Sequence, residues 1–478
     1  MNRMDQLCDP GTFTAITDGL ESRDPLGYPG YRDALARARA RAGTDESVVY
    51  GPAEITGRRC VVAMFRFAFI GGTMGEVAGE RVARAMEEAA AAGLPFVLWT
   101  QTGGARMQEG MRALVQMPKV VAARNELSSA HVPFVAVLGS PTTGGVLAAV
   151  AGLADVTFAV ENATIGFAGP RIVQRMTGRG LSNRSHTAHS AFDRGLVDAI
   201  ISEAHVRLEV GAALAVLAPD APHPIAGPPA PRGTPVDAWD AVDAARRPER
   251  PKGPELMRAI SEAAIVVRGD RSGNVDPALE TAIARVAGRR CIVIATDARR
   301  LLGPAAFRTA RRALGVATRL DLPVVTLVDT RGADPGEASE AGGIAWEIAS
   351  TFEAMLSAPV PTLAVVTGEG GSGGALALAA ADRIVLLEDA FFSVLAPEAA
   401  AEILWRDEAR AAEAASLLRL TAPDLVDLGV ADALLPAPLE PTRLRSAVAY
   451  HLDDLGAGAP DLDRPAARRK RWRRRGEP

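Results

Sequence analysis

Two stretches of the chain, LPFVLWTQTGGA at Leu94–Ala105 and LPVVTLVDTRGA at Leu322–Ala333, repeat one pattern. Each has Leu-Pro, then a run of apolar residues typical of a buried strand, then Thr-x-Gly-Ala. A further strand pattern starts after the same interval in each half, at Val132 and at Val360. Because chance spacing does not hold over so many residues, the pattern predicts an internal duplication.

Short apolar runs alternate with helical patterns on both sides of these stretches. We expect amphipathic helices at 79–92 and 305–318, each just ahead of the quoted strand. Strands that alternate with helices indicate an α/β fold in which helices pack on a sheet in each half.

The composition is that of a folded globular protein. Of 478 residues, 48% are hydrophobic, 23% are charged and 5% are aromatic, and the net charge is -4. These values exclude a mainly disordered chain and give no sign of a nucleic-acid-binding surface. No apolar run reaches the roughly 18 residues of a membrane span, and no signal peptide is visible. We therefore expect a soluble, cytoplasmic protein that does not bind a membrane.

Residues that bind metals or form disulfides are sparse. Cys8, Cys60 and Cys291 lie far apart and are too few for a four-cysteine zinc site or a disulfide framework. His186 and His189 are close in sequence, but no third ligand is evident, and we interpret them as exposed loop residues. The sequence predicts no metal site.

A proline-rich segment divides the chain. Seven prolines lie between Pro219 and Pro235, and proline cannot donate to a helix or sheet. The sequence predicts two domains, at 1–212 and 255–455, joined by a linker at 213–254. The end of the chain, 456–478, carries a block of arginines, and we expect it to be a disordered basic tail.

Each half also contains a glycine pair at an expected helix start, Gly144–Gly145 and Gly373–Gly374. Glycine lets the backbone come close to a ligand, and the first N–H groups of a helix have no partner within it. Such groups can hold the negative charge that develops on a carbonyl oxygen, as an oxyanion hole does. The alternative for one pair is tight packing of a strand on a helix. Two equivalent pairs favour a reaction in which two different carbonyls carry transient negative charge.

The segment Gly368–Gly374 also matches two unrelated patterns. With Glu388 it fits the dinucleotide-binding fingerprint, and around Ser372 it fits the nucleophile elbow of hydrolases. The equivalent loop of the first half has neither pattern. The only histidine downstream of Ser372 is His451, with nothing else to support a catalytic triad. We therefore disfavour both interpretations.

Two more loops of the first half are rich in glycine, Gly71–Gly75 and Gly103–Glu109. Within the second, Arg106 has the charge and shape to bind an anionic ligand. The alternative is that Arg106 and Glu109 form an ion pair at a helix start.

These residues resemble a known family. The first half is similar to the β subunit of the bacterial acetyl-CoA carboxylase carboxyltransferase, and the second half to its α subunit. The similarity to the β subunit lies in Phe67–Gly75, Gly103–Glu109, Pro141–Gly145 and Ala163–Arg171. The similarity to the α subunit lies in Asp329–Gly336, Gly368–Ala377, Ala396–Glu398 and Ile403–Trp405.

The resemblance implies a fold and a reaction. The fold would be the crotonase-like superhelix of repeated ββα units, once in each half. The reaction would move a carboxyl group from carboxybiotin to the α-carbon of acetyl-CoA and give malonyl-CoA, with biotin itself taking the α-proton. By resemblance, Gly144 and Gly145 hold the thioester oxygen, and Gly373 and Gly374 hold the ureido oxygen of biotin.

The resemblance also implies which residues surround the two substrates. The CoA side would be lined by Gly71, Gly72, Gly103, Gly104, Ala105 and Arg106. The biotin side would be lined by Thr330, Gly332, Gly336, Gly371 and Ser372.

Partners follow from what this sequence lacks. It has no biotin-attachment motif and no ATP-binding module, so we expect the biotin carboxyl carrier protein and the biotin carboxylase to be separate chains. The family's β subunit usually begins with a four-cysteine zinc ribbon, and only Cys8 stands in that region, so no zinc is predicted. Arg331 replaces the usual proline of its turn, and Ala399 replaces a glycine. A homodimer or larger homo-oligomer is expected.

Three alternatives stay open. The substrate could be another acyl-CoA such as propionyl-CoA. Related duplicated proteins remove CO2 from malonyl thioesters, so a decarboxylase would use the same two sites. A non-catalytic subunit is the third, although both glycine pairs are intact.

Overall fold

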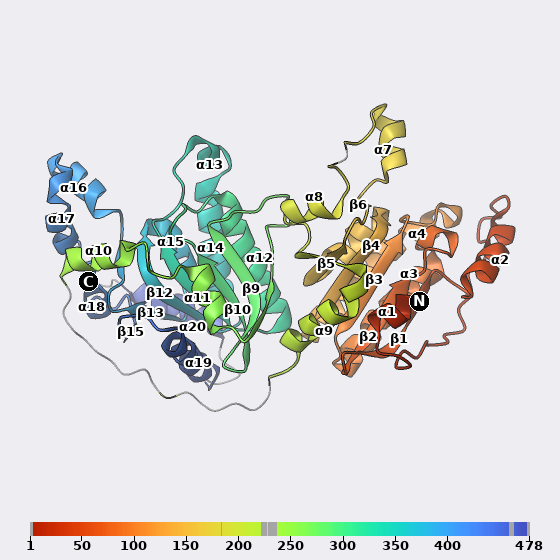
Figure 1. The fold of residues 1–478 in the computed structure, drawn as a ribbon, viewed down its shortest axis with the longest axis horizontal. Coiled ribbons are helices and arrows are strands. Elements are labelled where there is room, and N and C mark those ends of the chain that lie inside the picture. The colour runs from red at the N-terminus through yellow and green to blue at the C-terminus, as the bar shows by residue number, and fades with distance from the viewer. Residues whose placement is uncertain (1–2, 183, 221–226, 228–236, 458–462, 476–478) are drawn as a thin grey trace. The chain divides into compact units, whose positions relative to one another are not determined.

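A computed structural model describes residues 3–182, 184–220, 227, 237–457 and 463–475. The chain forms two compact units (Figure 1). The first is Met1–Leu217 together with Arg271–Gly273, and the second is Ala218–Asp270 together with Asn274–Pro478. Each unit has its own sheet, so each is described by itself.

The first unit is built on a seven-stranded sheet in the order β1-β2-β3-β4-β5-β7, with β6 paired to β4. Only β1 and β2 pair antiparallel, and the other pairs are parallel. The strands are β1 Val48–Ile55, β2 Arg58–Phe65, β3 Phe96–Thr102, β4 Phe134–Thr143, β5 Val156–Val160, β6 Ile165–Gly166 and β7 Ala199–Ile201.

The second unit has an eight-stranded sheet in the order β15-β13-β12-β11-β10-β9-β8, with β14 paired to β12. The pairs β8–β9 and β9–β10 are antiparallel, and the others are parallel. The strands are β8 Ala263–Val266, β9 Leu279–Val286, β10 Arg289–Thr296, β11 Val324–Thr330, β12 Thr362–Gly371, β13 Arg383–Leu387, β14 Phe391–Ser393 and β15 Ala433–Leu435.

The helices of the first unit are α1 Arg3–Leu7, α2 Tyr31–Ala42, α3 Glu76–Ala92, α4 Met111–Leu114, α5 Gln116–Ser129, α6 Gly144–Ala149, α7 Pro170–Thr177, α8 Ala188–Asp193 and α9 Val206–Leu217. Those of the second are α10 Ala238–Arg246, α11 Gly253–Ile260, α12 Pro304–Leu320, α13 Glu337–Ala341, α14 Ile344–Ser357, α15 Ser372–Ala379, α16 Pro397–Trp405, α17 Ala411–Leu417, α18 Ala422–Asp427, α19 Pro441–Ala457 and α20 Arg464–Arg474. Short 3-10 turns lie at Ile70–Gly72, Met107–Glu109, Ala151–Leu153, Glu203–His205 and Glu408–Arg410.

The central strands are apolar because both of their faces are covered. Every residue of β3, β11 and β12 is buried, as expected of parallel strands with helices on the sheet. The helices α3 and α12, predicted at 79–92 and 305–318, are confirmed and extend a few residues further. In α12 the buried side chains recur at helical spacing, from Phe307 through Leu314 to Leu320, because one face lies on the sheet.

The duplication is confirmed, and the strand register aligns the two halves. Thr102 pairs with Thr142 in the first sheet, as Thr330 pairs with Gly370 in the second. The helix that follows begins at Gly144 in one unit and at Ser372 in the other. The structural counterparts of Gly144–Gly145 are therefore Ser372–Gly373, one residue earlier than the glycine pair suggested.

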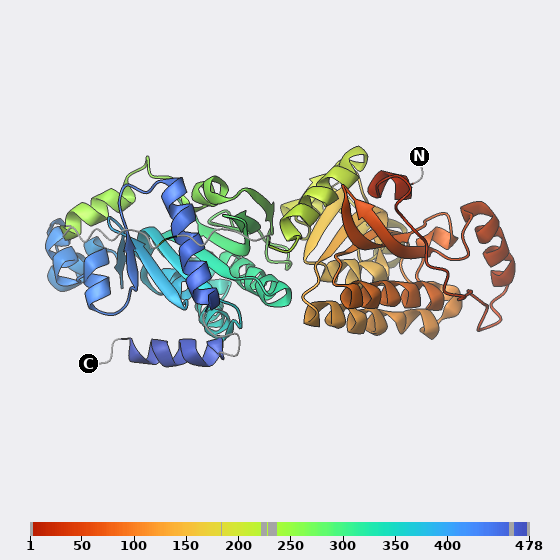
Figure 2. The ribbon, with the colours of Figure 1, turned by 90° about the horizontal axis from the view of Figure 1, so that it is seen from below.

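The sequence predicted a disordered basic tail, but Arg464–Arg474 forms the helix α20. This helix, dark blue beside the C marker in Figure 2, packs against α14. The Arg468 side chain is fully buried. It donates to both carboxylate oxygens of Asp382 at 2.7 and 2.6 Å and to three backbone carbonyls. A pattern of charges alone did not reveal that one arginine would be held inside the unit.

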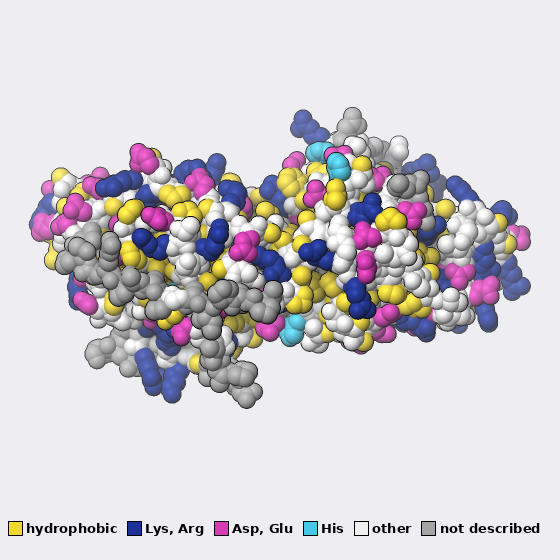
Figure 3. All heavy atoms as spheres, turned by 60° about the horizontal axis from the view of Figure 1, so that its bottom comes forward, with side chains coloured by type: hydrophobic (Ala, Val, Ile, Leu, Met, Phe, Trp, Pro, Cys, Tyr) yellow, Lys and Arg dark blue, Asp and Glu magenta, His cyan; other side chains and the backbone are white. Residues whose placement is uncertain are grey.

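The range expected as a linker, 213–254, is only partly irregular. It contains the end of α9, the whole of α10 and the start of α11. Most of its prolines lie at 221–226 and 228–236, outside the described residues. Within the described part of the chain, no helix is long and apolar enough to cross a membrane. Acidic and basic side chains are interspersed over the face drawn in Figure 3, which fits the net charge of -4.

Candidate active site

In the first unit, the loop after β3 lies against the start of α6. Met74 N–H donates to the Gly104 carbonyl at 2.8 Å, and Arg106 N–H donates to the Met74 carbonyl at 2.9 Å. Gly103 N–H donates to the Gly71 carbonyl at 2.9 Å. The structure thus brings together the two predicted glycine loops of this half.

Two glycines make the contact between this loop and α6. A Cβ on Gly144 would lie 2.8 Å from the Cα of Gly104, closer than real Cβ contacts. Both residues also have positive φ, +106° for Gly104 and +68° for Gly144, which L side chains rarely adopt. Both positions therefore require glycine.

The N–H groups at this contact differ in their partners. Gly144 N–H donates to the carbonyl of Phe167 at 2.8 Å, so the expectation that it binds an oxyanion is wrong. Ala105 N–H lies between the two bonds that tie the loop to Met74, and Gly145 N–H lies in the first turn of α6. Among the described residues, neither of these two groups has an acceptor. The free pair in this unit is therefore Ala105 with Gly145.

The second unit repeats the arrangement. Leu302 N–H donates to the Gly332 carbonyl at 3.0 Å, and Asp334 N–H donates to the Leu302 carbonyl at 2.9 Å, which leaves Ala333 N–H between them. Gly332 N–H donates to Thr330 Oγ1 at 3.1 Å, as Gly104 N–H donates to the hydroxyl of Thr102 at 2.9 Å. The same turn of backbone therefore exists twice.

The start of α15 supplies the other member of this pair. Ser372 is exposed and has φ +58°, like its counterpart Gly144. A Cβ on Gly373 would meet nothing within 4 Å, whereas one on Gly374 would lie 2.7 Å from the nitrogen of Ala333. Gly374 thus lets the Ala333 loop approach. The pair that corresponds to Ala105 and Gly145 is Ala333 and Gly373, whose N–H groups have no acceptor among the residues described.

Arg106 does not face a ligand, because its side chain is fully buried and held by acids. It pairs with both carboxylate oxygens of Glu46 and with Glu109 Oε1 at 3.1 Å. It also donates to the Thr73 carbonyl at 2.7 Å. The structure supports the ion-pair interpretation of Arg106 and overturns its assignment to the CoA side.

Burial disfavours the charged forms of Arg106 and Glu46, and their pairing favours the charged forms. Burial alone lowers the pKa of Arg106, but the Glu46 carboxylate raises it well above its usual value. Burial likewise raises the pKa of Glu46, and the Arg106 guanidinium brings it below the ordinary range. Both groups therefore stay charged and fix the loop that carries Ala105. Glu46 was not predicted, because no spacing in the sequence links it to Arg106.

The residues assigned to the biotin side do not all gather at the same place. Thr330 is the last residue of β11 and Gly332 lies in the turn after it, and a Cβ on Gly371 would collide with the Arg331 carbonyl beside them. Gly336 is exposed at the start of α13, and its N–H donates to Asp334 Oδ1 at 3.0 Å. This bond joins it to Asp334, the residue after Ala333, and Gly336 itself lies outside the turn.

The dinucleotide interpretation of 368–374 fails because these glycines are not a loop. Gly368, Gly370 and Gly371 belong to strand β12. A Cβ on Gly368 would collide with Asp329, and one on Gly370 would collide with the ring of Phe392. The glycines are needed for packing inside the sheet.

The hydrolase interpretation fails on distance. His451 Nδ1 lies 3.1 Å from the guanidinium of Arg383, at the start of β13, which pairs with Leu363 at the start of β12. Ser372 follows the other end of β12, about 30 Å away at the rise of a strand. Burial and Arg383 lower the pKa of His451 to about 4. His451 cannot serve Ser372 as a base.

No group of three or more histidine, cysteine, aspartate or glutamate side chains within the described ranges could hold a metal ion. The donors at the two sites are backbone N–H groups, which bind anionic oxygens and not cations.

Sequence comparisons match both halves. The family described as acetyl co-enzyme A carboxylase carboxyltransferase-like matches residues 234–453. The acetyl-coenzyme A carboxylase carboxyl transferase subunits beta/alpha of Salinispora arenicola is 40% identical, over 99% of this chain and 90% of that protein. The probable biotin-dependent acyl-coenzyme A carboxylase beta3 subunit of Mycobacterium tuberculosis is 36% identical, over 99% of this chain and 97% of that protein.

Solved structures show the same fold. Transcarboxylase 12S, with methylmalonyl-coenzyme A bound, has a TM-score of 0.78 at 24% identity and covers 96% of this chain and 90% of its own. A single-chain, multi-domain long-chain acyl-CoA carboxylase has a TM-score of 0.72 at 21% identity, over 93% of this chain and 46% of its own. The crotonase-like α/β fold is thereby confirmed.

Proposed function

Because the chain belongs to the acetyl-CoA carboxylase carboxyltransferase family, we propose that it carboxylates acetyl-CoA to malonyl-CoA with carboxybiotin as donor. In its general form the activity is that of the family, a biotin-dependent carboxyl transfer to an acyl-CoA. The carboxybiotin is carried by a separate protein. The choice of acetyl-CoA is the specific part of the proposal.

The repeated pair of free N–H groups carries the proposal. Ala105 and Gly145 form one pair, and Ala333 and Gly373 form the other. In the proposed reaction the first pair receives the thioester oxygen of acetyl-CoA as its α-carbon loses a proton. The second pair receives the ureido oxygen of biotin as the carboxyl group leaves. Preorganised donors of this kind are each worth about 10²–10³ in rate.

The transfer balances without a further reactant. The bond between the carboxyl carbon and the biotin nitrogen breaks, and a bond from that carbon to the α-carbon forms. The proton lost from the α-carbon ends on the biotin nitrogen. This chain contributes binding and charge stabilisation, and its two loops are fixed for that task by the Arg106 network and by the packing of Gly374.

Two partner proteins follow from this reaction. A biotin carboxyl carrier protein must deliver the carboxyl group, and a biotin carboxylase must load it. The chain itself would work as a homodimer or larger assembly, a proposal supported by the hexamer named for transcarboxylase 12S.

The reverse reaction tests the proposal. Purified protein is mixed with malonyl-CoA, with and without biocytin, and acetyl-CoA is followed by mass spectrometry. Acetyl-CoA that forms only with biocytin supports the proposal. Equal formation without biocytin identifies a decarboxylase. No turnover of malonyl-CoA, with turnover of methylmalonyl-CoA in a parallel tube, would replace acetyl-CoA by propionyl-CoA as the substrate.

A further inference from the structure

Residues 246–252 lie in the range that the sequence predicted to be a linker, and we call them the strap. The strap carries three basic residues, and each of them contacts an acid of the second unit. Arg250 donates to Asp389 Oδ2 at 2.8 Å, and Lys252 Nζ lies 3.9 Å from Asp329 Oδ2. The strap therefore forms a set of ion pairs with the body of this unit.

Arg246, the first basic residue of the strap, contacts three elements at once. Its Nε and one terminal nitrogen donate to the two carboxylate oxygens of Glu369 in β12, at 2.9 and 3.1 Å. The other terminal nitrogen donates to Glu398 Oε1 in α16 at 2.6 Å. The guanidinium also lies 5.7 Å from the ring centre of Phe391 in β14. Because a two-pronged bond fixes the orientation of the carboxylate as well as its distance, Arg246 fixes β12 against β14 and α16.

These contacts lie where the two segments that carry the free N–H groups begin. Ala333 and Gly373 stand four residues after Asp329 and Glu369, respectively, as the numbers 329 to 333 and 369 to 373 show. The N–H of Glu369 donates to Asp329 Oδ1 at 3.0 Å. The two segments are thus joined directly to each other before they separate, and Arg246 holds the acid on one side of this bond.

The first unit makes the same turn without these charges. The strand register places Gln101 and Pro141 where the second unit has Asp329 and Glu369. Because proline has no N–H to donate, the strands are joined in the opposite sense, by a bond from the Gln101 amide to the Ser140 carbonyl. The duplicated fold therefore does not require the charged cluster, which belongs to the second unit specifically.

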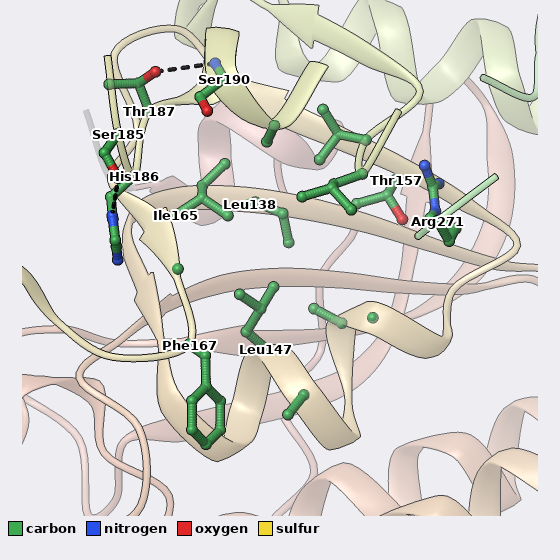
Figure 4. Close-up of a pocket in the computed structure, with 17 residues that line it drawn as sticks. Leu138, Leu147, Thr157, Ile165, Phe167, Ser185, His186, Thr187, Ser190 and Arg271 are labelled. Carbon is green, nitrogen blue, oxygen red and sulfur yellow. Dashed lines mark hydrogen bonds between the residues drawn. The ribbon is translucent and has the colours of Figure 1, made fainter. Parts of the chain in front are cut away.

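The other side of the helix start also differs between the units. Figure 4 shows a cavity beside α6, lined mainly by apolar side chains such as Leu147, Ile165 and Phe167. There the Phe167 carbonyl accepts the Gly144 N–H, so a neutral contact holds the segment after β6. In the second unit the segment after β14 leads to Glu398, which Arg246 holds by an ion pair. An ionic contact supports the start of α15 on this side too.

We propose that Arg246 is a positioning residue for the biotin side. Through Glu369 and Glu398 it holds the start of α15, and with it the Gly373 N–H, at the distance from Ala333 that the ureido oxygen of biotin requires. The inference rests on the proposed function, because it needs biotin at this pair. Arg246 itself touches no substrate, but a displacement of about 1 Å at a reacting group can lower the rate about 10²-fold.

Arg246→Gln tests this, because glutamine removes the charge and the two-pronged bond. Transfer of the carboxyl group from malonyl-CoA to biocytin is measured, and rates are expressed per folded protein at the assay temperature. The kcat/KM for biocytin should fall at least about tenfold. The KM for malonyl-CoA and the dissociation constant of acetyl-CoA, measured by calorimetry, should stay unchanged, because the CoA side belongs to the first unit.

Two further variants calibrate the result. Arg246→Lys keeps the charge but not the two-pronged bond, so its kcat/KM for biocytin should fall between those of Arg246→Gln and wild type. It also carries the test if Arg246→Gln does not fold, and wild-type kinetics for it would then overturn the proposal. Arg247→Gln, at the exposed neighbouring position, is the control and should behave as wild type.

A purely structural role for Arg246 gives a different result. Arg246→Gln would then lower the melting temperature, while the folded fraction would keep the wild-type kcat/KM for biocytin. That outcome would overturn the proposal, and so would an equal rise in the KM values for biocytin and malonyl-CoA.

Failure of this inference differs from failure of the proposed function. Biocytin-dependent transfer that is the same in wild type and in Arg246→Gln would contradict only the positioning role. Absence of biocytin-dependent transfer in the unaltered protein would contradict the proposed function itself.

Discussion

A side chain on Gly144 would place its Cβ 2.8 Å from the Cα of Gly104. This contact sets the separation between the loop that carries Ala105 and the helix that carries Gly145. Gly104→Ala should therefore push the two N–H groups apart and lower kcat/KM by about 10²–10³. Steady-state turnover of malonyl-CoA with biocytin measures the loss. Gly180→Ala, at an exposed glycine with open space and no positive φ, is the control and should keep full activity.

In the second unit, two substitutions distinguish a glycine needed for the approach of the substrate from a glycine needed for the packing of the Ala333 loop. Gly373→Val should abolish turnover by blocking the approach of the ureido oxygen, yet leave the melting temperature nearly unchanged, because its Cβ meets nothing within 4 Å. Gly374→Val should lower both the turnover and the melting temperature, because its Cβ would lie 2.7 Å from Ala333 N. Equal melting temperatures for the two variants would contradict the assignment of Gly374 to packing.

The buried pair of Arg106 and Glu46 should matter for stability more than for binding. Glu46→Gln leaves a buried guanidinium poorly compensated and should cost about 3 kcal/mol of unfolding free energy at neutral pH. Urea unfolding of the first unit measures it. If stability is unchanged and the KM for acyl-CoA rises, Arg106 would instead contribute to substrate binding.

The same pair gives a dependence on pH. The pKa of Glu46 is lowered in the folded protein, so its contribution is complete above the unfolded pKa, about 4.5. It is lost as the pH falls through the lower folded value. The stability difference between wild type and Glu46→Gln should shrink from pH 7 to pH 3. A difference that grows on acidification would contradict the pairing.

Arg468 should anchor the last helix. Arg468→Ala leaves Asp382 without its fully buried partner and should lower the stability of the second unit by about 3 kcal/mol. It should also expose 464–474 to limited proteolysis. Arg469→Ala, at an exposed position of the same helix, should change stability by less than about 0.5 kcal/mol.

The sequence predicted the duplicated α/β fold, because the period of the pattern is independent of the details of packing. The resemblance to the family implied that Gly71, Gly104 and Gly145 surround one substrate, and the loops that carry them do lie together. In the second half the sequence pattern placed the equivalent pair one residue too late. Gly373–Gly374 looks like the counterpart of Gly144–Gly145, but the structural counterpart is Ser372–Gly373. Only the strand pairing resolves that ambiguity.

Two other differences have a common cause. Arg106 and Arg468 looked like surface or ligand-binding charges, and both are fully buried, against Glu46 and Asp382, which lie far away in the sequence; only the Glu109 partner of Arg106 is local. Partners at such separations leave no local pattern. The glycines of β12 fit the dinucleotide fingerprint, an interpretation that the sequence already disfavoured, and in the structure they make room for Asp329 and Phe392.

The most direct test of the central claim follows the carboxyl group itself. Malonyl-CoA labelled with carbon-13 at its free carboxyl carbon is incubated with the protein and biocytin, and the label is located by mass spectrometry. If the two pairs of N–H groups support carboxyl transfer, the label will appear in carboxybiocytin, and one acetyl-CoA will form for each label transferred. Label found only in CO2, released at the same rate without biocytin, would contradict carboxyl transfer and leave a decarboxylase.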